Sequence, residues 1–364
     1  CSPIFEYSET ALNFITLVGM LTAFFAATVA LVQNDIKKII AYSTCSQLGY
    51  MFFAVGVGAY HVAIFHLFTH AFFKALLFLG SGCVIHSFNN EQDIRLMGGV
   101  WKKIPYTYLL MIIGTLALTG FPFLSGYYSK DAIIESAYFK GSTIGYYAAF
   151  IGIGVAFLTS IYSWRLIFKT FHGKYKNKKN SFNKIHESPI IMLLPASILG
   201  IGSILTGILF KDLFIGEDNY NFWGNSILFL KNILHTHPPD WLPITIMFLV
   251  TVAIPISYYL YIMNEKILIN FIIKNKKFYH FFLNKWYFDE IYDFIFIKPI
   301  KKLGVFFWYK GDIKTIDRFG PDGFAKLVKK ISDRSVNFQS GYIYHYAFIM
   351  LIGLSILLTY LIVY

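Results

Sequence analysis

The chain has 364 residues, of which 56% are hydrophobic, 19% aromatic and only 14% charged. This balance excludes an ordinary soluble globular protein and predicts a protein that crosses a membrane several times. The net charge of +12 does not indicate nucleic-acid binding, because the basic residues lie between apolar segments rather than in a folded soluble patch. The three cysteines, Cys1, Cys45 and Cys83, lack the spacing of a disulfide framework or a thiolate metal site.

Eight segments are candidate membrane spans. A span needs about 20 mostly apolar residues, and this criterion selects residues 11–32, 36–58, 60–87, 105–139, 142–168, 189–210, 242–263 and 342–364. The predicted fold class is therefore an all-α polytopic membrane protein with about eight transmembrane helices. Because Cys1 precedes a span by a few residues and is not an initiator methionine, we expect that a natural N-terminal part is missing. A lipoprotein-type N-terminal cysteine is the alternative.

The basic residues between the spans predict the topology. The connections after spans one, three, five and seven are basic, and the first three contain Lys37, Lys38, Arg95, Lys102, Lys103 and seven basic residues from Arg165 to Lys184. The connections after spans two, four and six contain only Lys140, Lys211 and Lys231. By the positive-inside rule, the first set is expected to face the cytoplasm or the mitochondrial matrix.

The third span contains three titratable side chains in the run AIFHLFTHAFFKALLF, residues 63–78. His66, His70 and Lys74 are spaced by four residues, which places them along one helix face at steps of about 6 Å. An ionisable group inside a membrane costs about 2.5–3.5 kcal/mol on insertion scales, so packing alone would not require Lys74. Burial disfavours the charged form of an amine, so we expect Lys74 and His70 to exchange a proton at small cost near neutral pH.

This motif has two alternative interpretations besides proton transfer. His66 and His70 could bind a metal ion or a haem, although no carboxylate or cysteine lies nearby in sequence and a cation on the same face would repel a metal. Lys74 could instead extend its amine to the membrane interface, although it lies near the centre of the span. Its position favours the proton-transfer interpretation.

Other polar residues in or beside the spans give weaker signals. Ser43, Thr44, Ser46 and Gln47 could line a wet path or form the more common interhelical hydrogen bonds. His86 and His345 are expected to be structural. The charged residues at the start of span two are expected to be a solvated boundary, with proton entry as the alternative; they are Asp35, Lys37 and Lys38.

The fourth span is unusually long and contains the run ALTGFPFLSGYYSKDAII. Its helix-breaking and charged residues are Gly120, Pro122, Gly126, Lys130 and Asp131. Because proline removes a backbone donor and clashes with the preceding turn, we expect a break at about Phe121 to Ser125. Discontinuous helices occur at ion sites of transporters, where protein or a water-filled cavity satisfies the irregular backbone. With Lys130 just beyond the break, we favour a functional site over a simple proline kink.

Residues 271–339 combine charged and apolar residues at helical spacing. Between Lys298 and Arg334 there are ten basic and four acidic residues. We expect Pro299 and the GPDG turn at Gly320–Gly323 to interrupt the helix. The segment therefore predicts a long, broken amphipathic helix on the positive side, before one last membrane anchor. An interfacial helix on anionic lipid is the alternative.

Several motifs resemble one family over essentially the whole chain. They are QNDIKKIIAYSTCSQLGYM (33–51), FHLFTHAFFKALLFLGSG (65–82), EQDIRLMGG (91–99), GFPFLSGYYSKD (120–131), NFWGNS (221–226), KWYFDEIYD (285–293) and QSGYIYHYAF (339–348). Together they resemble the largest antiporter-like membrane subunits of respiratory complex I, which are called subunit L in bacteria and chain 5 in mitochondria.

The resemblance implies a division of the chain into four parts. Residues 1–172 would form the second of two inverted five-helix repeats, and residues 173–263 would add two further spans. Residues 264–341 would form a lateral helix along neighbouring pump subunits, and residues 342–364 a C-terminal anchor. The first eight helices of the family, with the glutamate and lysine of its first half-channel, have no counterpart here, so we expect a missing segment or a separate chain to supply them.

The resemblance also implies roles for residues. Lys74 would be the central lysine of a proton path linked through His66 and His70, Lys130 the lysine that leads to the exit side, and Asp131 its neighbour. The implied function is proton translocation by a membrane-arm subunit of NADH:quinone oxidoreductase, in a mitochondrial inner membrane or, as the second possibility, an alphaproteobacterial plasma membrane. NADH, FMN, iron–sulfur clusters and quinone would be bound by partner subunits, with no cofactor or metal in this chain.

Two functional alternatives accompany this prediction. The large subunit of a multisubunit sodium/proton antiporter carries the same motifs, although that homologue continues into more membrane helices beyond the position of Tyr364. The chain could also be mainly a structural clamp, holding the membrane arm together through its lateral helix. The expected partners are the other membrane-arm subunits and lipid, and not nucleic acid.

Overall fold

The computed structural model describes residues 2–176, 182–216, 218–228 and 239–364. It divides into two compact units, Cys1–Trp286 and Tyr287–Tyr364. Within the described residues the regular structure is helical, and the β-type pairing is a single isolated bridge between Asp35 and Asp93. The predicted all-α class is confirmed.

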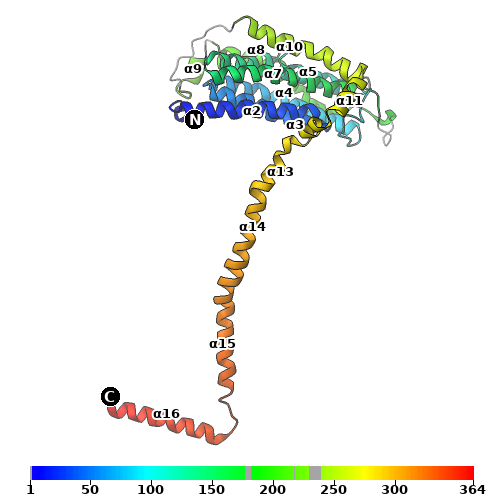
Figure 1. Ribbon diagram of the computed structural model, residues 1–364. Coiled ribbons are helices and arrows are strands. Elements are labelled where there is room, and N and C mark those ends of the chain that lie inside the picture. The colour runs from blue at the N-terminus through cyan, green and yellow to red at the C-terminus, as the bar shows by residue number, and fades with distance from the viewer. Residues whose placement is uncertain (1, 177–181, 217, 229–238) are drawn as a thin grey trace. The chain divides into compact units, whose positions relative to one another are not determined.

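The first unit is a helical bundle (Figure 1). Its long helices are α2 (Glu9–Val32), α3 (Ile36–Gly56), α4 (Tyr60–Ser87), α5 (Pro105–Thr119), α6 (Ser125–Phe139), α7 (Thr143–Ile167), α8 (Ile190–Phe214) and α10 (Trp241–Tyr258). Four shorter helices are α1 (Ser2–Phe5), α9 (Asn219–Trp223), α11 (Glu265–Lys274) and α12 (Lys276–Leu283). A π-helical turn, η1 (Phe168–His172), extends α7, and another, η3 (Tyr259–Met263), extends α10.

All eight predicted spans are helical, but six helices of the described residues are both long and apolar enough to cross a membrane. These six are Glu9–Val32, Tyr60–Ser87, Thr143–His172, Ile190–Phe214, Trp241–Met263 and Ile343–Val363. Helix α3 falls outside this set, since it combines Lys37 and Lys38 with the polar run around Ser43. The span predicted at 105–139 is divided into α5 and α6, each of which has 15 residues.

The connections predicted to be on the positive side meet at one end of the bundle. The backbone N–H of Ile36 donates to the carbonyl of Gln92 at 3.0 Å, and that of Trp101 donates to Phe171 at 3.3 Å. At the other end, the Lys140 amine donates to the carbonyl of Gly56 at 2.9 Å. Alternate connections therefore lie at opposite ends, as the charge pattern predicts.

Helices α2 and α3 approach so closely that glycine is needed between them. A Cβ atom on Gly49 of α3 would lie 2.5 Å from the backbone nitrogen of Ala23 and 2.8 Å from the carbonyl oxygen of Gly19. The Ser46 hydroxyl also donates to the Ala23 carbonyl, at 2.9 Å. Small residues that bring backbones together are a general means of packing membrane helices. This contact fixes the position of α3, which carries two of the site residues described below.

We therefore expect Gly49→Ala to lower the free energy of unfolding by about 1–3 kcal/mol, because the added methyl group must displace backbone rather than a flexible side chain. The measurement is the thermal unfolding midpoint of the purified protein in mild detergent. Gly154→Ala in α7 is the matched control, since a Cβ there meets nothing within 4 Å. Equal midpoints for Gly49→Ala and the unchanged protein would contradict this packing.

The second unit consists of α13 (Phe288–Tyr292), α14 (Lys298–Phe306), α15 (Pro321–Val336) and α16 (Ile343–Val363), with a π-helical turn at Asp293–Ile297 and a longer π-helix at Phe307–Asp317. None of these helices buries a residue. The break expected at the GPDG turn occurs at Gly320, where the backbone leaves helical geometry. The amphipathic region predicted at 264–341 thus consists of several helical segments, of which α11 and α12 belong to the first unit.

The break expected at Pro299 is wrong. Helical backbone continues from Ile297 through Lys298, and Pro299 lies in the first turn of α14, directly after a π-helical turn. Proline is tolerated in a first turn because the backbone N–H that it lacks would have no α-helical partner there. An interruption that the sequence did not indicate occurs instead at Lys285–Tyr287, where three consecutive residues have left-handed φ angles of 54–57°.

Candidate functional site

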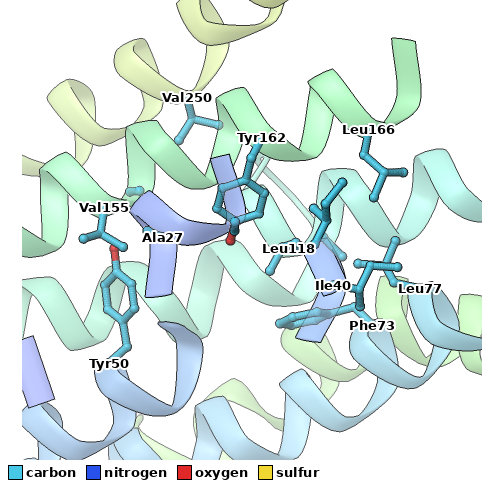
Figure 2. Packing of buried hydrophobic residues seen from close by; sticks show 14 of the residues in the cluster. Ala27, Ile40, Tyr50, Phe73, Leu77, Leu118, Val155, Tyr162, Leu166 and Val250 are labelled. Atoms are coloured by element: carbon cyan, nitrogen blue, oxygen red, sulfur yellow. The ribbon is translucent and has the colours of Figure 1, made fainter. Parts of the chain in front are cut away.

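Lys74 is enclosed by the first unit. Its exposed fraction is 4%, and its Nζ donates a hydrogen bond of 2.5 Å to Oγ of Ser43 on α3. The same Oγ accepts a second hydrogen bond of 2.7 Å from the phenol O–H of Tyr162 on α7. Figure 2 shows the Tyr162 ring extending from its helix into the bundle, with the phenol oxygen at its inner end. One serine hydroxyl therefore connects helices α3, α4 and α7 at the lysine amine.

A small cavity of about 10 Å³ lies beside this contact. Its polar lining consists of Ser43, Lys74, Thr115, Tyr162 and Ser163, and its apolar lining of Ile39, Ile40, Leu77, Leu118 and Leu166. This volume is close to the minimum that one water molecule needs, and the polar lining offers it partners. The Lys74 amine thus lies in a polar spot that branched apolar side chains surround.

His66 forms the centre of a second polar cluster. Its Nε2 lies 3.0 Å from Oε1 of Gln47 on α3, and its Nδ1 lies 2.9 Å from Oγ of Ser129 on α6. The Thr69 hydroxyl also donates to the Ser129 Oγ, at 2.8 Å. Both ring nitrogens are therefore engaged, and the imidazole bridges α3 and α6 within the bundle.

His70 lies on α4 between these two clusters in sequence. It is buried, and its Nε2 has no hydrogen-bond partner among the residues that the structure describes. Its ring centroid is 5.8 Å from that of His66. A buried polar atom without a protein partner costs about 1–3 kcal/mol, so few are retained in native proteins. His70 Nε2 can accept or donate a proton without first breaking a hydrogen bond.

The helix break lies where the sequence predicts it. Helix α5 ends at Thr119, Gly120 has a left-handed φ of 80°, and α6 begins at Ser125. The Lys130 amine reaches back from α6 and donates to the carbonyl of Thr119, at the C-terminal end of α5. The helix macrodipole places partial negative charge at that end, which favours a cation there. The broken helix therefore supplies the neutral oxygen that holds Lys130.

Asp131 follows Lys130 and is also buried, with 4% exposure. Within the described part of the chain, neither of its carboxylate oxygens has a hydrogen-bond partner. A buried carboxylate without direct partners is rare and is typical of functional sites. The structure thus places all five predicted site residues in the interior of the bundle, in three groups centred on Lys74, His66 and Lys130.

Tyr162, Ser129 and Thr69 complete these groups, and sequence reasoning did not identify them. Hydroxyl residues are common in membrane helices, where they often bond within their own helix, so composition alone gives no signal for them. Of the weaker polar signals, Ser43 and Gln47 belong to the site. Ser46 and Thr44 donate to backbone carbonyls and serve packing.

The other polar residues considered from sequence lie outside the three groups. Asp35 caps the start of α3, where its side chain accepts from the backbone N–H of Lys38 at 3.0 Å. His345 bonds with the Ser340 hydroxyl at 2.7 Å, and His86 is exposed beside the ring of His186. Among the described residues, no group of three or more His, Cys, Asp or Glu side chains is placed to hold a metal ion.

Comparison with known proteins places this arrangement in a family. The family model described as "NADH:quinone oxidoreductase/Mrp antiporter, TM" matches residues 1–159, which contain both buried lysines. The model described as "NADH dehydrogenase subunit 5 C-terminus" matches residues 224–363. The two matches lie on either side of α8 and together cover most of the chain.

Individual relatives agree with these models. NADH-ubiquinone oxidoreductase chain 5 of Marchantia polymorpha is 43% identical over 99% of this chain and 55% of the relative. NADH-quinone oxidoreductase subunit L of Rickettsia bellii is 44% identical over 99% of this chain and 56% of the relative. The solved structure of an Mrp complex from Dietzia sp. shares the fold, with a TM-score of 0.52 and 21% identity over 96% of this chain and 34% of that one.

The family model, together with the shared fold, defines an antiporter-like membrane subunit. Within this class, the chain belongs to the family of complex I chain 5 and subunit L, as its motifs predict. It spans little more than half the length of the curated relatives that it matches.

Burial and topology can be tested together by labelling lysines in sealed membrane vesicles with an amine-reactive reagent that does not cross the membrane. Lys37 and Lys102, which are exposed at one end of the bundle, should react from one side, and Lys211 from the other. Lys74 and Lys130 should react from neither side until the protein is denatured. Mass spectrometry of each peptide gives the result, and equally fast labelling of Lys74 and Lys102 would contradict the described burial.

Proposed function

We propose that this chain is a proton-translocating membrane-arm subunit of an NADH:quinone oxidoreductase in an energy-transducing inner membrane. The observation that carries the proposal is the enclosed Lys74 amine, which is hydrogen-bonded to a hydroxyl that Tyr162 also contacts. The relatives named above support the choice of complex. The chain carries no redox group in this proposal, and NADH, FMN, iron–sulfur clusters and quinone are bound by partner subunits.

The hydroxyl of Ser43 gives the site two hydrogen-bonded states. While Lys74 is an ammonium ion, Ser43 accepts from both the amine and Tyr162, which fills its two lone pairs. When Lys74 loses a proton, its nitrogen becomes an acceptor, and the Ser43 O–H can rotate to donate to it. Both states keep the lysine nitrogen bonded, so the amine can lose and regain a proton with little rearrangement of the helices.

The energies involved are of similar size. A charged side chain at the centre of a membrane costs about 2.5–3.5 kcal/mol on insertion scales. Moving one charge across a potential of 100 mV costs about 2.3 kcal/mol. A modest change in the hydration or charge around Lys74 is therefore enough to favour proton loss at one stage and proton uptake at another. Redox energy released elsewhere in the complex supplies that change.

Lys130 is the second proton-carrying group in this proposal. The carbonyl of Thr119 accepts a hydrogen bond from the amine, and the carboxylate of Asp131 lies near enough to interact with it electrostatically without a direct ion pair. The His66 cluster joins the helices that carry the two lysines, because the ring of His66 on α4 bonds to Ser129 on α6. Protons are proposed to pass from the Lys74 side through the histidines toward Lys130 and Asp131.

Two other functions are favoured by particular observations. The family model and the Dietzia Mrp structure also fit the large subunit of a sodium/proton antiporter. The second unit, whose helices bury no residues of their own, fits a lateral clamp that covers neighbouring subunits. Proton transport that does not depend on sodium would favour the complex I subunit over the antiporter. Loss of proton transport on substitution of a site residue, in a complex that still assembles, would favour it over the clamp.

Lys74→Met tests the central role of the amine. Methionine keeps much of the apolar volume but cannot carry a proton, so we expect fewer protons translocated per electron, or a lower coupled oxidase rate, in a complex that still assembles. Proton uptake and electron transfer are measured together in reconstituted vesicles. Lys102→Met, at an exposed position, is the control. An assembled Lys74→Met complex with unchanged coupling would leave only the clamp function.

Gly120→Ala tests the position of Lys130 without removing it. A Cβ on Gly120 would lie 3.0 Å from the Lys130 Nζ, so we expect the amine to be displaced from the Thr119 carbonyl and proton translocation to fall. Gly141→Ala is the matched control, because Gly141 also has a left-handed φ of 65° but its nearest contact would be the carbonyl oxygen of Phe139 at 3.8 Å. If proton translocation fell equally in both variants, backbone strain alone would explain the loss. That result would contradict the expectation that displacement of Lys130 causes it.

A further inference from the structure

A pocket of about 550 Å³ lies at the basic end of the first unit. The connections after α2, α4 and η1 contribute Asn34, Arg95 and Lys176 to its wall, and the first residue of α11, Glu265, completes this side. By the positive-inside rule, this end of the bundle faces the cytoplasm or matrix. The pocket is separate from the cavity beside Lys74 and shares no residue with it.

The polar part of the pocket carries an excess of positive charge. Four basic side chains line it, namely Arg95, Arg165, Lys169 and Lys176. Two carboxylates oppose them, because Glu265 pairs with both lysines and Asp93 pairs with Arg95. The basic side chains that line the pocket therefore outnumber their direct carboxylate partners by two.

Arg165 is the most unusual of these residues. It is 7% exposed, and its guanidinium donates to the carbonyls of Leu31 and Gln33 at 3.0 and 2.6 Å and to Oδ1 of Asn34 at 2.8 Å. All three acceptors are neutral, so the charge of this buried guanidinium is not cancelled by a direct carboxylate contact. Because Arg165 also lines the pocket, its positive charge favours an anion there.

Most of the remaining wall of the pocket is apolar. Helices α11 and α12 supply the larger part of it, through Leu268, Ile269, Phe271, Ile272, Phe278 and Phe282. Phe271 and Phe278 are 64% and 68% exposed, which is unfavourable in water. A cluster of cations beside an exposed apolar wall, at the end of membrane helices, matches an amphiphile with an anionic head and hydrocarbon chains.

We infer that this pocket binds an anionic phospholipid. Its phosphate group lies among Arg165, Lys169 and Lys176, and its acyl chains lie along the apolar side of α11 and α12. A free phosphate ion and a phospholipid head group carry the same anionic phosphoryl group. The apolar wall favours the phospholipid, because only the lipid has hydrocarbon chains to cover it. The inference stands apart from the proposed proton path, because none of the pocket residues belongs to the Lys74, His66 or Lys130 groups.

Photocrosslinking tests the inference in the membrane assembly purified with the subunits that accompany this chain. The assembly is reconstituted into vesicles that contain equal mole fractions of either phosphatidylglycerol or phosphatidylcholine, each with a diazirine on its acyl chain. Crosslinked peptides are located by mass spectrometry. We expect phosphatidylglycerol to label residues 265–283 several-fold more than phosphatidylcholine, with roughly fivefold loss of this preference for each basic side chain removed.

Three variants make the test specific. Lys176→Gln removes a charge from a half-exposed side chain and should not disturb folding, whereas Arg165→Gln removes the buried guanidinium. Lys102→Gln, which removes an exposed charge outside the pocket, should leave the labelling preference unchanged. Lys74→Met should also leave it unchanged, so failure of the proton path and failure of the lipid site can be told apart.

Three outcomes would overturn the inference. Equal labelling by the two lipids would show that the wall contacts bulk lipid without selecting a head group. Loss of labelling when inorganic phosphate replaces chloride at constant ionic strength would assign the pocket to a free anion. Absence of labelling at residues 265–283 by either lipid, with normal labelling of α16, would show that polypeptide fills the pocket.

Discussion

A cationic side chain enclosed by membrane helices is the constraint on which the rest of this structure depends. Lys74 would destabilise an apolar bundle by several kcal/mol if it had no partner. The bundle lowers this cost with a hydroxyl rather than a carboxylate, since Ser43 bonds to both the amine and Tyr162. A carboxylate would hold the ammonium form permanently, whereas a hydroxyl can bond to either form of the amine. In the proposed function, this neutral partner is what would let the lysine transfer a proton.

Lys130 also has a neutral hydrogen-bond partner, a backbone carbonyl, although here the buried carboxylate of Asp131 lies nearby as well. An intact helix would use that carbonyl internally, so the break after Thr119 is required to free it. Close packing elsewhere keeps these partners in place. The glycine contact between α2 and α3 positions Ser43 and Gln47, and the bridging ring of His66 fixes α3 relative to α6. Packing, helix breakage and site geometry are therefore parts of one arrangement.

Much of the fold could be predicted from the sequence, because apolar length defines spans and a proline between glycines defines a break. The charged site residues could also be predicted, since Lys74 and Lys130 stand out against their apolar neighbours. Their partners could not, because the hydroxyls of Tyr162 and Ser129 belong to helices that are distant in sequence and resemble many other hydroxyls. The error at Pro299 has a local cause: a preceding π-helical turn placed the proline where its missing N–H is tolerated.

The most direct test of this account is the charge state of the Lys74 nitrogen during turnover. It can be followed by ¹⁵N NMR of side-chain-labelled lysine in reconstituted membranes, with the signal assigned by its loss in Lys74→Arg. The account predicts that both an ammonium and an amine signal are populated while electrons flow, and that their ratio changes when electron flow stops. A single ammonium signal that is the same with and without turnover would contradict it.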